Sequence, residues 1–251
     1  MLDAVKSGDA KKLAELIRQD PGFNVNLDHG DGFTLLHYAC LRGDRSAVIP
    51  LLLAHPDINV NAKNIFGGTP FYLACVNGDA SCVREMLKDH RVKVNEHNNN
   101  GCTPLWKAVR YGYLDVIKWW IASGREMDLG TPGDLNQTDV IGAARKKGKA
   151  EVVSLLEKFK ENPVETRHAV RIQVGWYDEA AEMFAMVVFV SDGLLQIKAT
   201  SPTPAARFFN IVSKLPLELQ MLLCFRLIGS GKDIIPYKER ETAFKILVKK
   251  L

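Results

Sequence analysis

The sequence predicts an all-α protein in which about five repeated helix pairs stack into a solenoid, followed by a helical segment at the C-terminus. A motif that starts with threonine and ends with alanine recurs with a period of 34 to 35 residues, at 34–39, 69–74, 103–108 and, in degraded form, 138–143. A glycine follows in step, at Gly8, Gly43, Gly78, Gly112 and Gly148. An apolar residue followed by Asn or Asp also recurs, ending at Asn26, Asn61, Asn95 and Asp128. Motifs that keep register at such a period are typical of repeat architectures.

The repeats divide residues 1–161 into five units, near 1–27, 28–61, 62–95, 96–128 and 129–161. Each unit is expected to begin its first helix at the threonine, whose hydroxyl can accept a hydrogen bond from a free backbone N–H. Pro70 and Pro104 occupy the next position, where a missing N–H costs nothing. The glycine is expected to end that helix with left-handed backbone angles, which only glycine adopts at little cost.

A second helix is expected after each glycine, because apolar residues there recur at helical spacing. These residues are Leu13, Leu16, Ile17, Val48, Leu51, Leu52, Val83, Met86, Leu87, Ile117, Trp120, Ile121, Val153 and Leu156. We expect them to face the neighbouring units, and we expect Trp106 on the first helix to fill core volume as well. Between units, 28–33, 62–67 and 96–101 are rich in Gly, Asn and Asp, which predicts projecting turns.

Composition changes after residue 161, and residues 162–251 are expected to form a separate helical domain. Helices are predicted over 164–174 and 177–190, and further helices are predicted to start near 203, 215 and 236. Residues 187–198 also fit a hairpin, so helix and hairpin both stay open there. The region is long enough to form a small bundle that covers the apolar end of the repeats.

The repeated motif resembles the T-P-L-H-x-A signature of the ankyrin repeat, and the resemblance covers about 1–161. Leu35 replaces the proline of the first copy, Tyr72 and Trp106 replace the histidine, and the last copy keeps only Thr138 and small residues. The resemblance implies a protein partner, bound by the turn tips and by the concave face of the first helices. We therefore expect a non-enzymatic protein–protein interaction module or scaffold.

Carrying the variable surface positions of that family onto this chain gives candidate partner-binding residues on the tips and on the first helices. They are Phe33, Ile65, Phe66, Asn99 and Asn100 on the tips, and Arg42, Asn77, Arg110 and Lys146 on the first helices. Phe33, Phe66, Arg42 and Arg110 are the strongest, since aromatic and guanidinium groups supply large contact area with polar reach. The alternative is that the two phenylalanines only pack against adjacent tips.

The segment 215–219 reads Leu-Pro-Leu-Glu-Leu and resembles the start of an F-box, a helical module that recruits a cullin ubiquitin ligase through its adaptor. The residues that would carry this resemblance are Leu215, Pro216, Leu219 and Leu223. It implies, as an alternative function, a substrate receptor that binds the cullin-ligase adaptor. The same string is also an ordinary helix start in a capping bundle, in which Leu219 and Leu223 would be buried.

No enzyme class is favoured, because the sequence has neither a glycine-rich phosphate loop nor a G-x-S-x-G nucleophile elbow. An active site hidden in the C-terminal region is the least favoured alternative. The six histidines show no metal-ligand spacing, so we expect neither a metal nor another cofactor.

The net charge of +4 is spread thinly, with 21 basic and 20 acidic residues in 1–161, which argues against nucleic acid as a partner. Five cysteines with no C-x-x-C pair favour a reducing compartment. No targeting segment is visible, and no apolar run approaches the ~20 residues of a membrane-spanning helix. We therefore expect no membrane association and a cytoplasmic location, with the nucleus as the alternative.

Overall fold

The computed structural model describes residues 1–130, 139–191, 212, 215–216, 219–221 and 223–224. These residues form helices and turns and include no strand, which confirms the all-α fold class. Contacts along the chain divide it into two compact units, Met1–Val170 and Arg171–Leu251. Within the described residues, no helix has both the length and the apolar character needed to cross a membrane.

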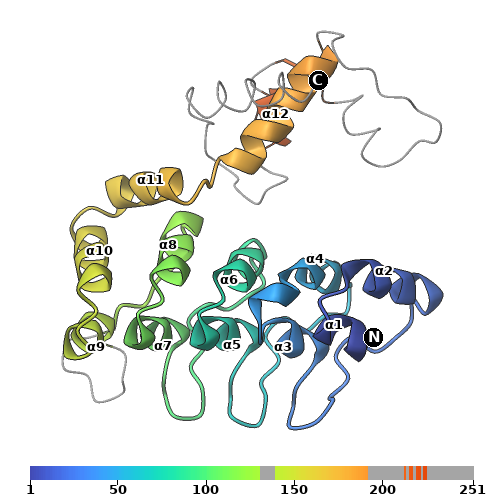
Figure 1. The fold of residues 1–251 in the computed structure, drawn as a ribbon, viewed down its shortest axis with the longest axis horizontal. Coiled ribbons are helices and arrows are strands. Elements are labelled where there is room, and N and C mark those ends of the chain that lie inside the picture. The colour runs from blue at the N-terminus through green and yellow to red at the C-terminus, as the bar shows by residue number, and fades with distance from the viewer. Residues whose placement is uncertain (131–138, 192–211, 213–214, 217–218, 222, 225–251) are drawn as a thin grey trace. The chain divides into compact units, whose positions relative to one another are not determined.

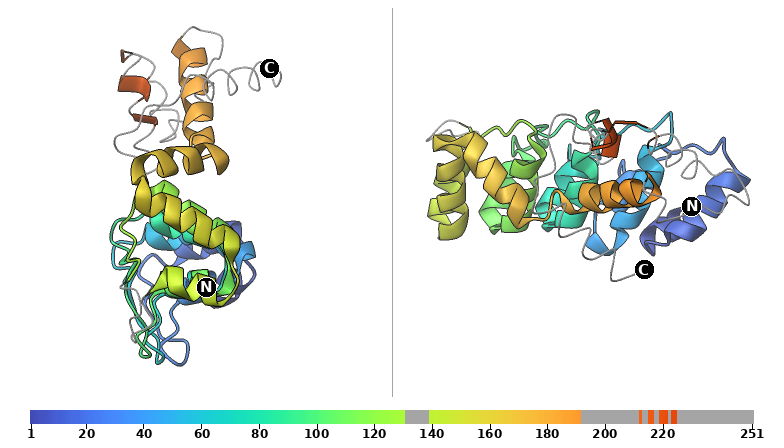
Figure 2. Two further views of the ribbon diagram at one scale, coloured as in Figure 1. Left: turned by 90° about the vertical axis from the view of Figure 1, so that its left-hand side faces the viewer. Right: turned by 90° about the horizontal axis from the view of Figure 1, so that it is seen from above.

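The first compact unit is a stack of helix pairs that follow one another in sequence. The pairs are α1 (Leu2–Lys6) with α2 (Ala10–Gln19), α3 (Leu35–Ala39) with η1 (Gly43–Val48) and α4 (Ile49–Leu53), α5 (Pro70–Asn77) with α6 (Ala80–Leu87), α7 (Pro104–Tyr111) with α8 (Leu114–Ser123), and α9 (Val140–Lys146) with α10 (Ala150–Glu161). The first helices contact one another in chain order, and so do the second helices (Figure 1). The loops between pairs project to one side in Figure 1 and in the left view of Figure 2. Helix α11 (Pro163–Gln173) follows.

Threonine caps start the first helices, as the sequence predicts. The hydroxyl oxygen of Thr69 accepts the backbone N–H of Tyr72, and that of Thr103 accepts the N–H of Trp106, both at 3.1 Å. In the second unit, Thr34 and the ring of His37 cap the helix reciprocally. Each cap satisfies backbone donors that the first helical turn leaves free.

The fifth unit departs from the predicted register by one residue. Asp139 caps its first helix by accepting the N–H of Gly142 at 2.8 Å, so Thr138, which lies outside the described residues, is not the cap. Ala144 is fully buried and its carbonyl accepts the N–H of Lys149 at 3.0 Å. Ala74 and Ala108 accept the corresponding N–H groups in their units. The surface positions of this unit that match those of the other units are therefore Lys146, which the sequence predicts, and Lys147.

The predicted left-handed backbone angles occur at Gly8, Gly78, Gly112 and Gly148, where φ is 69°, 74°, 82° and 64°. The prediction is wrong for Gly43, whose φ is not positive, because the preceding helix already ends at Ala39. Gly43 instead lies close to a side chain of the next unit. A Cβ at Gly43 would lie 3.0 Å from the carboxylate of Asp79 in the next unit.

The same close approach recurs along the stack. A Cβ at Gly78 would lie 2.6 Å from the ring of Tyr113, and one at Gly112 would lie 2.7 Å from the side chain of Lys149. Each glycine thus makes room for a residue of the following unit. A Cβ at Gly148 would meet no atom of the described residues within 4 Å, so this edge of the last unit is open.

The second helices bury most of the predicted apolar residues between units, whereas Leu16, Ile17 and Leu51 are only half-buried. Trp120 is fully buried and its ring packs edge-on against Phe71 of the preceding unit, with ring centroids 5.0 Å apart. Trp106 is 7% exposed, which confirms its expected place in the core. In the last unit Val152 is buried and the predicted Val153 is only half-buried.

The second compact unit contains helix α12 (Asp178–Ser191), so the helix is confirmed over 187–191 and the rest of the hairpin alternative lies outside the described residues. Its core is formed by Tyr177, Ala181, Phe184, Ala185, Val187, Val212 and Cys224. Short helical pieces occur at 219–221 and 223–224. The helices expected near 203 and 236 lie outside the described residues, and the covering of the repeat end by this region stays a prediction.

Replacing Gly78 with alanine should lower the free energy of unfolding by about 1–2 kcal/mol from the left-handed backbone alone, and further through the clash with Tyr113. Urea unfolding of the full chain measures the loss. Gly22→Ala is the matched control, because its Cβ would have nothing within 4 Å and its φ is not positive. Equal unfolding midpoints for the two variants would contradict this account of the turn.

Candidate partner-binding surface

One side chain fixes the turn in each of the first three projecting loops, all of which lie within the described residues. An Asp or Asn oxygen accepts two backbone N–H groups, those of the residues two and four positions later. Asp28 does so at 2.7 and 3.0 Å, Asn64 at 3.0 and 2.9 Å, and Asn98 at 3.1 and 3.0 Å. Asn64 and Asn98 are buried, so these turns are internally fixed rather than held by solvent.

Neighbouring tips are also bonded to one another. The N–H of Ile65 donates to the carbonyl of Asp31 at 3.0 Å, and the N–H of Asn99 donates to the carbonyl of Phe66 at 3.0 Å. The amide side chain of Asn99 donates to the carbonyl of Ile65 at 2.8 Å. Asn99, predicted as a binding residue, therefore uses its side chain to join two tips, while Asn100 is exposed.

The apolar tip residues differ in how far they project. Ile65 and Phe66 are 57% and 61% exposed. Phe33 is half-buried, and its ring packs on His37 and Tyr38 of its own unit, with ring centroids 5.5 and 5.7 Å apart. Phe33 thus packs on α3 of its own unit, and most of the Phe66 side chain is exposed.

The first helices present one continuous face, which we call the first-helix face. It consists of the residues one before, two after and three after the buried alanine of each unit, positions that share one side of a helix. The alanines are Ala4, Ala39, Ala74, Ala108 and Ala144, all at most 1% exposed. The face is Asp3, Lys6, Ser7, Tyr38, Leu41, Arg42, Leu73, Val76, Asn77, Lys107, Arg110, Tyr111, Ala143, Lys146 and Lys147.

Three cations on this face form cation–π contacts with aromatic rings. The guanidinium of Arg110 and the ammonium of Lys107 lie 5.0 and 5.5 Å from the ring centroid of Trp106, and Lys6 lies 4.8 Å from that of Tyr38. The predicted pairing of a guanidinium with an aromatic thus occurs at Arg110, although its partner is a core tryptophan rather than a tip phenylalanine. Such contacts orient a cation without neutralising it.

The other predicted first-helix residues have neighbours of their own. Arg42 forms an exposed ion pair with Asp44 at 3.1 Å, which adds little to stability. The amide of Asn77 donates to the carbonyl of Leu41 at 3.2 Å, joining two adjacent units. Lys146 is exposed and belongs to the first-helix face in the corrected register.

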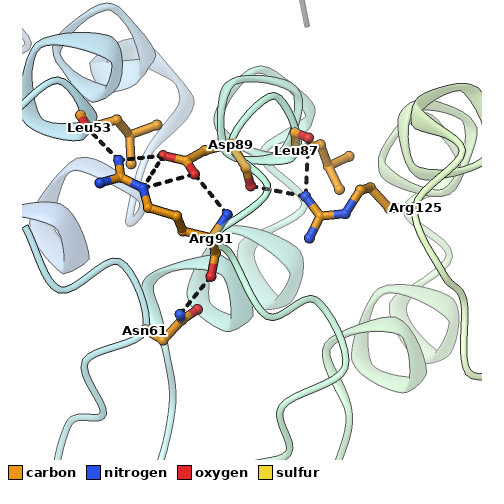
Figure 3. A network of polar contacts seen from close by, with 6 residues as sticks. All are labelled: Leu53, Asn61, Leu87, Asp89, Arg91 and Arg125. Atoms are coloured by element: carbon orange, nitrogen blue, oxygen red, sulfur yellow. Dashed lines mark hydrogen bonds and ion pairs between the residues drawn. The ribbon is translucent and has the colours of Figure 1, made fainter. Parts of the chain in front are cut away.

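A polar network joins consecutive units away from the tips, in the segments that follow the second helices (Figure 3). The guanidinium of Arg91 donates to Asp89 at 2.6 Å and to the carbonyl of Leu53 at 2.7 Å. Arg125 donates to the carbonyls of Asp89, at 2.9 Å, and Leu87, at 3.5 Å. Burial alone would raise the pKa of Asp89, but the hydrogen bonds from Arg91 hold it below its usual value. These groups are occupied in holding units together.

The recurrent asparagine has the same role, which the sequence analysis did not assign. Asn26 bonds to the backbone of Asp57 and Asn59 at 2.7 and 2.8 Å. Asn61 bonds to the backbone of Arg91 and Lys93, each at 2.8 Å. The recurrence of the asparagine at the repeat period could have indicated this role, because each asparagine forms hydrogen bonds with residues about one repeat further along the chain.

His37 links the second unit to the third. Its Nδ1 accepts the N–H of Thr34 at 3.1 Å, so Nε2 carries the proton and donates to the carbonyl of Gly68 at 3.2 Å. Burial lowers the pKa of His37 below its ordinary value, outweighing its hydrogen bonds. The neutral imidazole is therefore part of the structure rather than a free acid or base.

The cysteines are also structural. All five are free and buried. Burial raises the pKa of the Cys82 thiol to about 12 and also raises those of Cys40 and Cys75, which suppresses the reactive thiolate. In the part of the chain that the structure describes, no three His, Cys, Asp or Glu side chains group closely enough to hold a metal ion.

The residues of the F-box resemblance are only partly buried. Leu219 is 45% exposed and Pro216 is exposed, whereas Leu215 and Leu223 are half-buried, and Leu223 packs on the core of its unit. The capping-bundle expectation that Leu219 and Leu223 are both buried is wrong for Leu219. Binding to a cullin-ligase adaptor stays a sequence prediction.

The helix pairs are stacked in sequence, with fixed loops that project from one side. Residues 44–131 of this stack match the family model described as ankyrin repeats in three copies. Alpha-latrocrustotoxin-Lt1a from Latrodectus tredecimguttatus is 29% identical over 79 residues, which are 32% of this chain and 5% of that protein. The chain thus matches about a twentieth of the length of this relative. Ankyrin repeats commonly serve as protein–protein interaction modules. The family match does not reach the segment that resembles an F-box.

The free energy of unfolding should depend on pH in part through the protonation of His37. In the unfolded chain its pKa returns to about 6.5, so the unfolded state takes up a proton at a higher pH than the native state. The free energy of unfolding is then undiminished above that pH and falls as the pH drops toward the lowered native value.

His37→Gln removes this titration. Urea unfolding between mildly alkaline and mildly acidic pH should show a shallower loss of stability for the variant than for the parent chain. The difference between the two curves isolates His37 from the other histidines. Parallel curves would contradict the neutral, buried imidazole.

Proposed function

We propose that this chain is a non-enzymatic interaction module that binds a protein partner through its tips and its first-helix face. The observation that carries the proposal is the pair Ile65 and Phe66, two large apolar side chains more than half exposed on a turn fixed by Asn64. Exposed apolar groups on a rigid support are typical of protein interfaces.

The rigidity of the tips supports the same proposal. A loop that is already ordered loses little conformational freedom when it binds, so more of the contact energy remains as affinity. The turn hydrogen bonds and the bonds from tip to tip provide this order before any partner arrives. Neither set of bonds needs the Ile65 or Phe66 side chain.

The titratable groups that could suggest chemistry have structural partners. His37 is held neutral in a helix cap, and the buried thiols have raised pKa values. We therefore propose no catalytic step for this chain. Arg42 and Arg110 instead offer charge on the first-helix face, where the exposed Tyr111 follows Arg110 in the chain.

Reversing the charge at two positions of the face tests the proposal. The tagged full chain is used as bait in a cell lysate, and the captured proteins are compared with those captured by the combined variant Arg42→Glu and Arg110→Glu. Because interface anchors contribute on the order of 1–2 kcal/mol each, the amount captured should fall about tenfold or more. Thermal melting should be unchanged.

The control is Lys11→Glu with Lys12→Glu, an equal charge change on exposed residues of α2, outside the first-helix face. This variant should capture what the parent chain captures. Capture that survives in the Arg42 and Arg110 variant would refute the proposed surface.

A further inference from the structure

The charges on the first-helix face are almost all of one sign. The cations are Lys6, Arg42, Lys107, Arg110, Lys146 and Lys147, and the acid is Asp3, which gives the face a net charge of +5. Residues 1–161 as a whole carry 21 basic and 20 acidic side chains, a net charge of +1. The remainder of these residues is therefore net acidic, at −4, and the positive charge is concentrated on this face.

Most of these cations have no carboxylate partner. Arg42 is paired with Asp44. For the other five cations, no carboxylate of the described residues lies within ion-pair distance. Lys6, Lys107 and Arg110 instead lie on aromatic rings, which leaves their charge available.

Apolar residues occupy the middle of the face. Leu73 and Val76 on α5, and Leu41, which follows α3, are half-buried. Lys6 and Asp3 of α1 come before them in the stack, and the cations of α7 and α9 come after them (Figure 1). The exposed Ile65 and Phe66 belong to the same unit as Leu73 and Val76. The apolar centre of the face thus lies between Lys6, which shares its unit with Asp3, and the larger cationic group formed by Lys107, Arg110, Lys146 and Lys147.

From this pattern we infer that the partner binds the first-helix face through an acidic segment of a protein, with apolar side chains near its centre. The inference rests on the proposed function and adds the chemistry of the partner. Its acids would face Lys107, Arg110, Lys146 and Lys147 at one end and Lys6 at the other. Its apolar centre would cover Leu73, Val76 and Phe66. Charge complementarity of this kind guides association and selects among partners.

A nucleic acid fits the face less well. A phosphate backbone presents charge at short, regular intervals and would bring that charge over the apolar centre as well. Burying Leu73 and Val76 under phosphates would gain nothing for the complex. A protein segment can vary its side chains along its length, so it can match both parts of the face.

Selection from a random peptide library displayed on phage tests the inference with the full chain as the target. Neighbouring helices lie about 8–10 Å apart, so five of them span about 40 Å, which about 12 extended residues cover. The selected peptides should be enriched in Asp and Glu over the unselected library, with apolar residues between the acids. Selection that enriches no sequence would count against the inference.

The selected peptide is then synthesised, labelled and titrated by fluorescence anisotropy. Arg110→Glu with Lys146→Glu should weaken its binding about tenfold or more, and added salt should weaken binding to the parent chain. The Lys11→Glu with Lys12→Glu variant should bind as the parent chain does. A short duplex DNA is titrated in parallel and should bind more weakly than the peptide.

The outcomes separate the inference from the function on which it rests. Selected peptides without acidic enrichment that still lose affinity in the Arg110 and Lys146 variant would overturn the acidic partner and leave the proposed surface standing. Peptides that bind this variant undiminished would overturn both. Duplex DNA that binds more tightly than the peptide, and is lost in the same variant, would assign the face to nucleic acid and overturn the inference.

Discussion

Contact between neighbouring units is the constraint on which the rest of the repeat structure depends. A single helix pair exposes apolar residues on both sides, and only the adjoining pair can cover them. Phe71 against Trp120 shows this burial, and the bonds from Asn61 to Arg91 and Lys93 add polar links between the same kind of neighbours. Where a unit lacks a neighbour, as beside Gly148, the edge is open within the described residues.

Stacking in register also creates the candidate binding surface. Residues about 35 positions apart in sequence come to lie on adjacent first helices, so Arg42, Asn77 and Tyr111 occupy equivalent positions along one face. The tips are aligned in the same way through the bonds from Ile65 to Asp31 and from Asn99 to Phe66. Residues that are far apart in the sequence thus form one continuous surface, although each unit contributes only a few of them.

Local physics made part of this structure predictable. Threonine caps, a proline after the cap and the left-handed glycines at 78 and 112 depend on residues within one turn, so the sequence alone indicates them. The fifth unit was placed one residue early because Thr138 and Asp139 are both good caps, and the burial of Ala144 decides between them. The left-handed angle predicted for Gly43 is wrong. The contact that involves this glycine is with Asp79, which belongs to another unit and cannot be read from the local sequence.

The sequence predicted which residues lie on the candidate surface, but it did not predict which neighbours each side chain contacts. The repeat places Phe33 and Phe66 at comparable tips, yet only packing on His37 and Tyr38 shows that Phe33 is held down. Asn99 fills a surface position in the repeat, but its amide is used by the adjacent tip. Such assignments need three-dimensional contacts, because each depends on a neighbour that the period alone does not identify.

Amide hydrogen exchange, resolved by residue in the free full chain, tests most directly whether neighbouring units hold the tips rigid. The account predicts that the N–H groups of Ile65 and Asn99, which donate to the preceding tips, exchange as slowly as amides within the helices of the stack. Exchange of both at the rate of an unstructured chain, while helical amides stay protected, would contradict it.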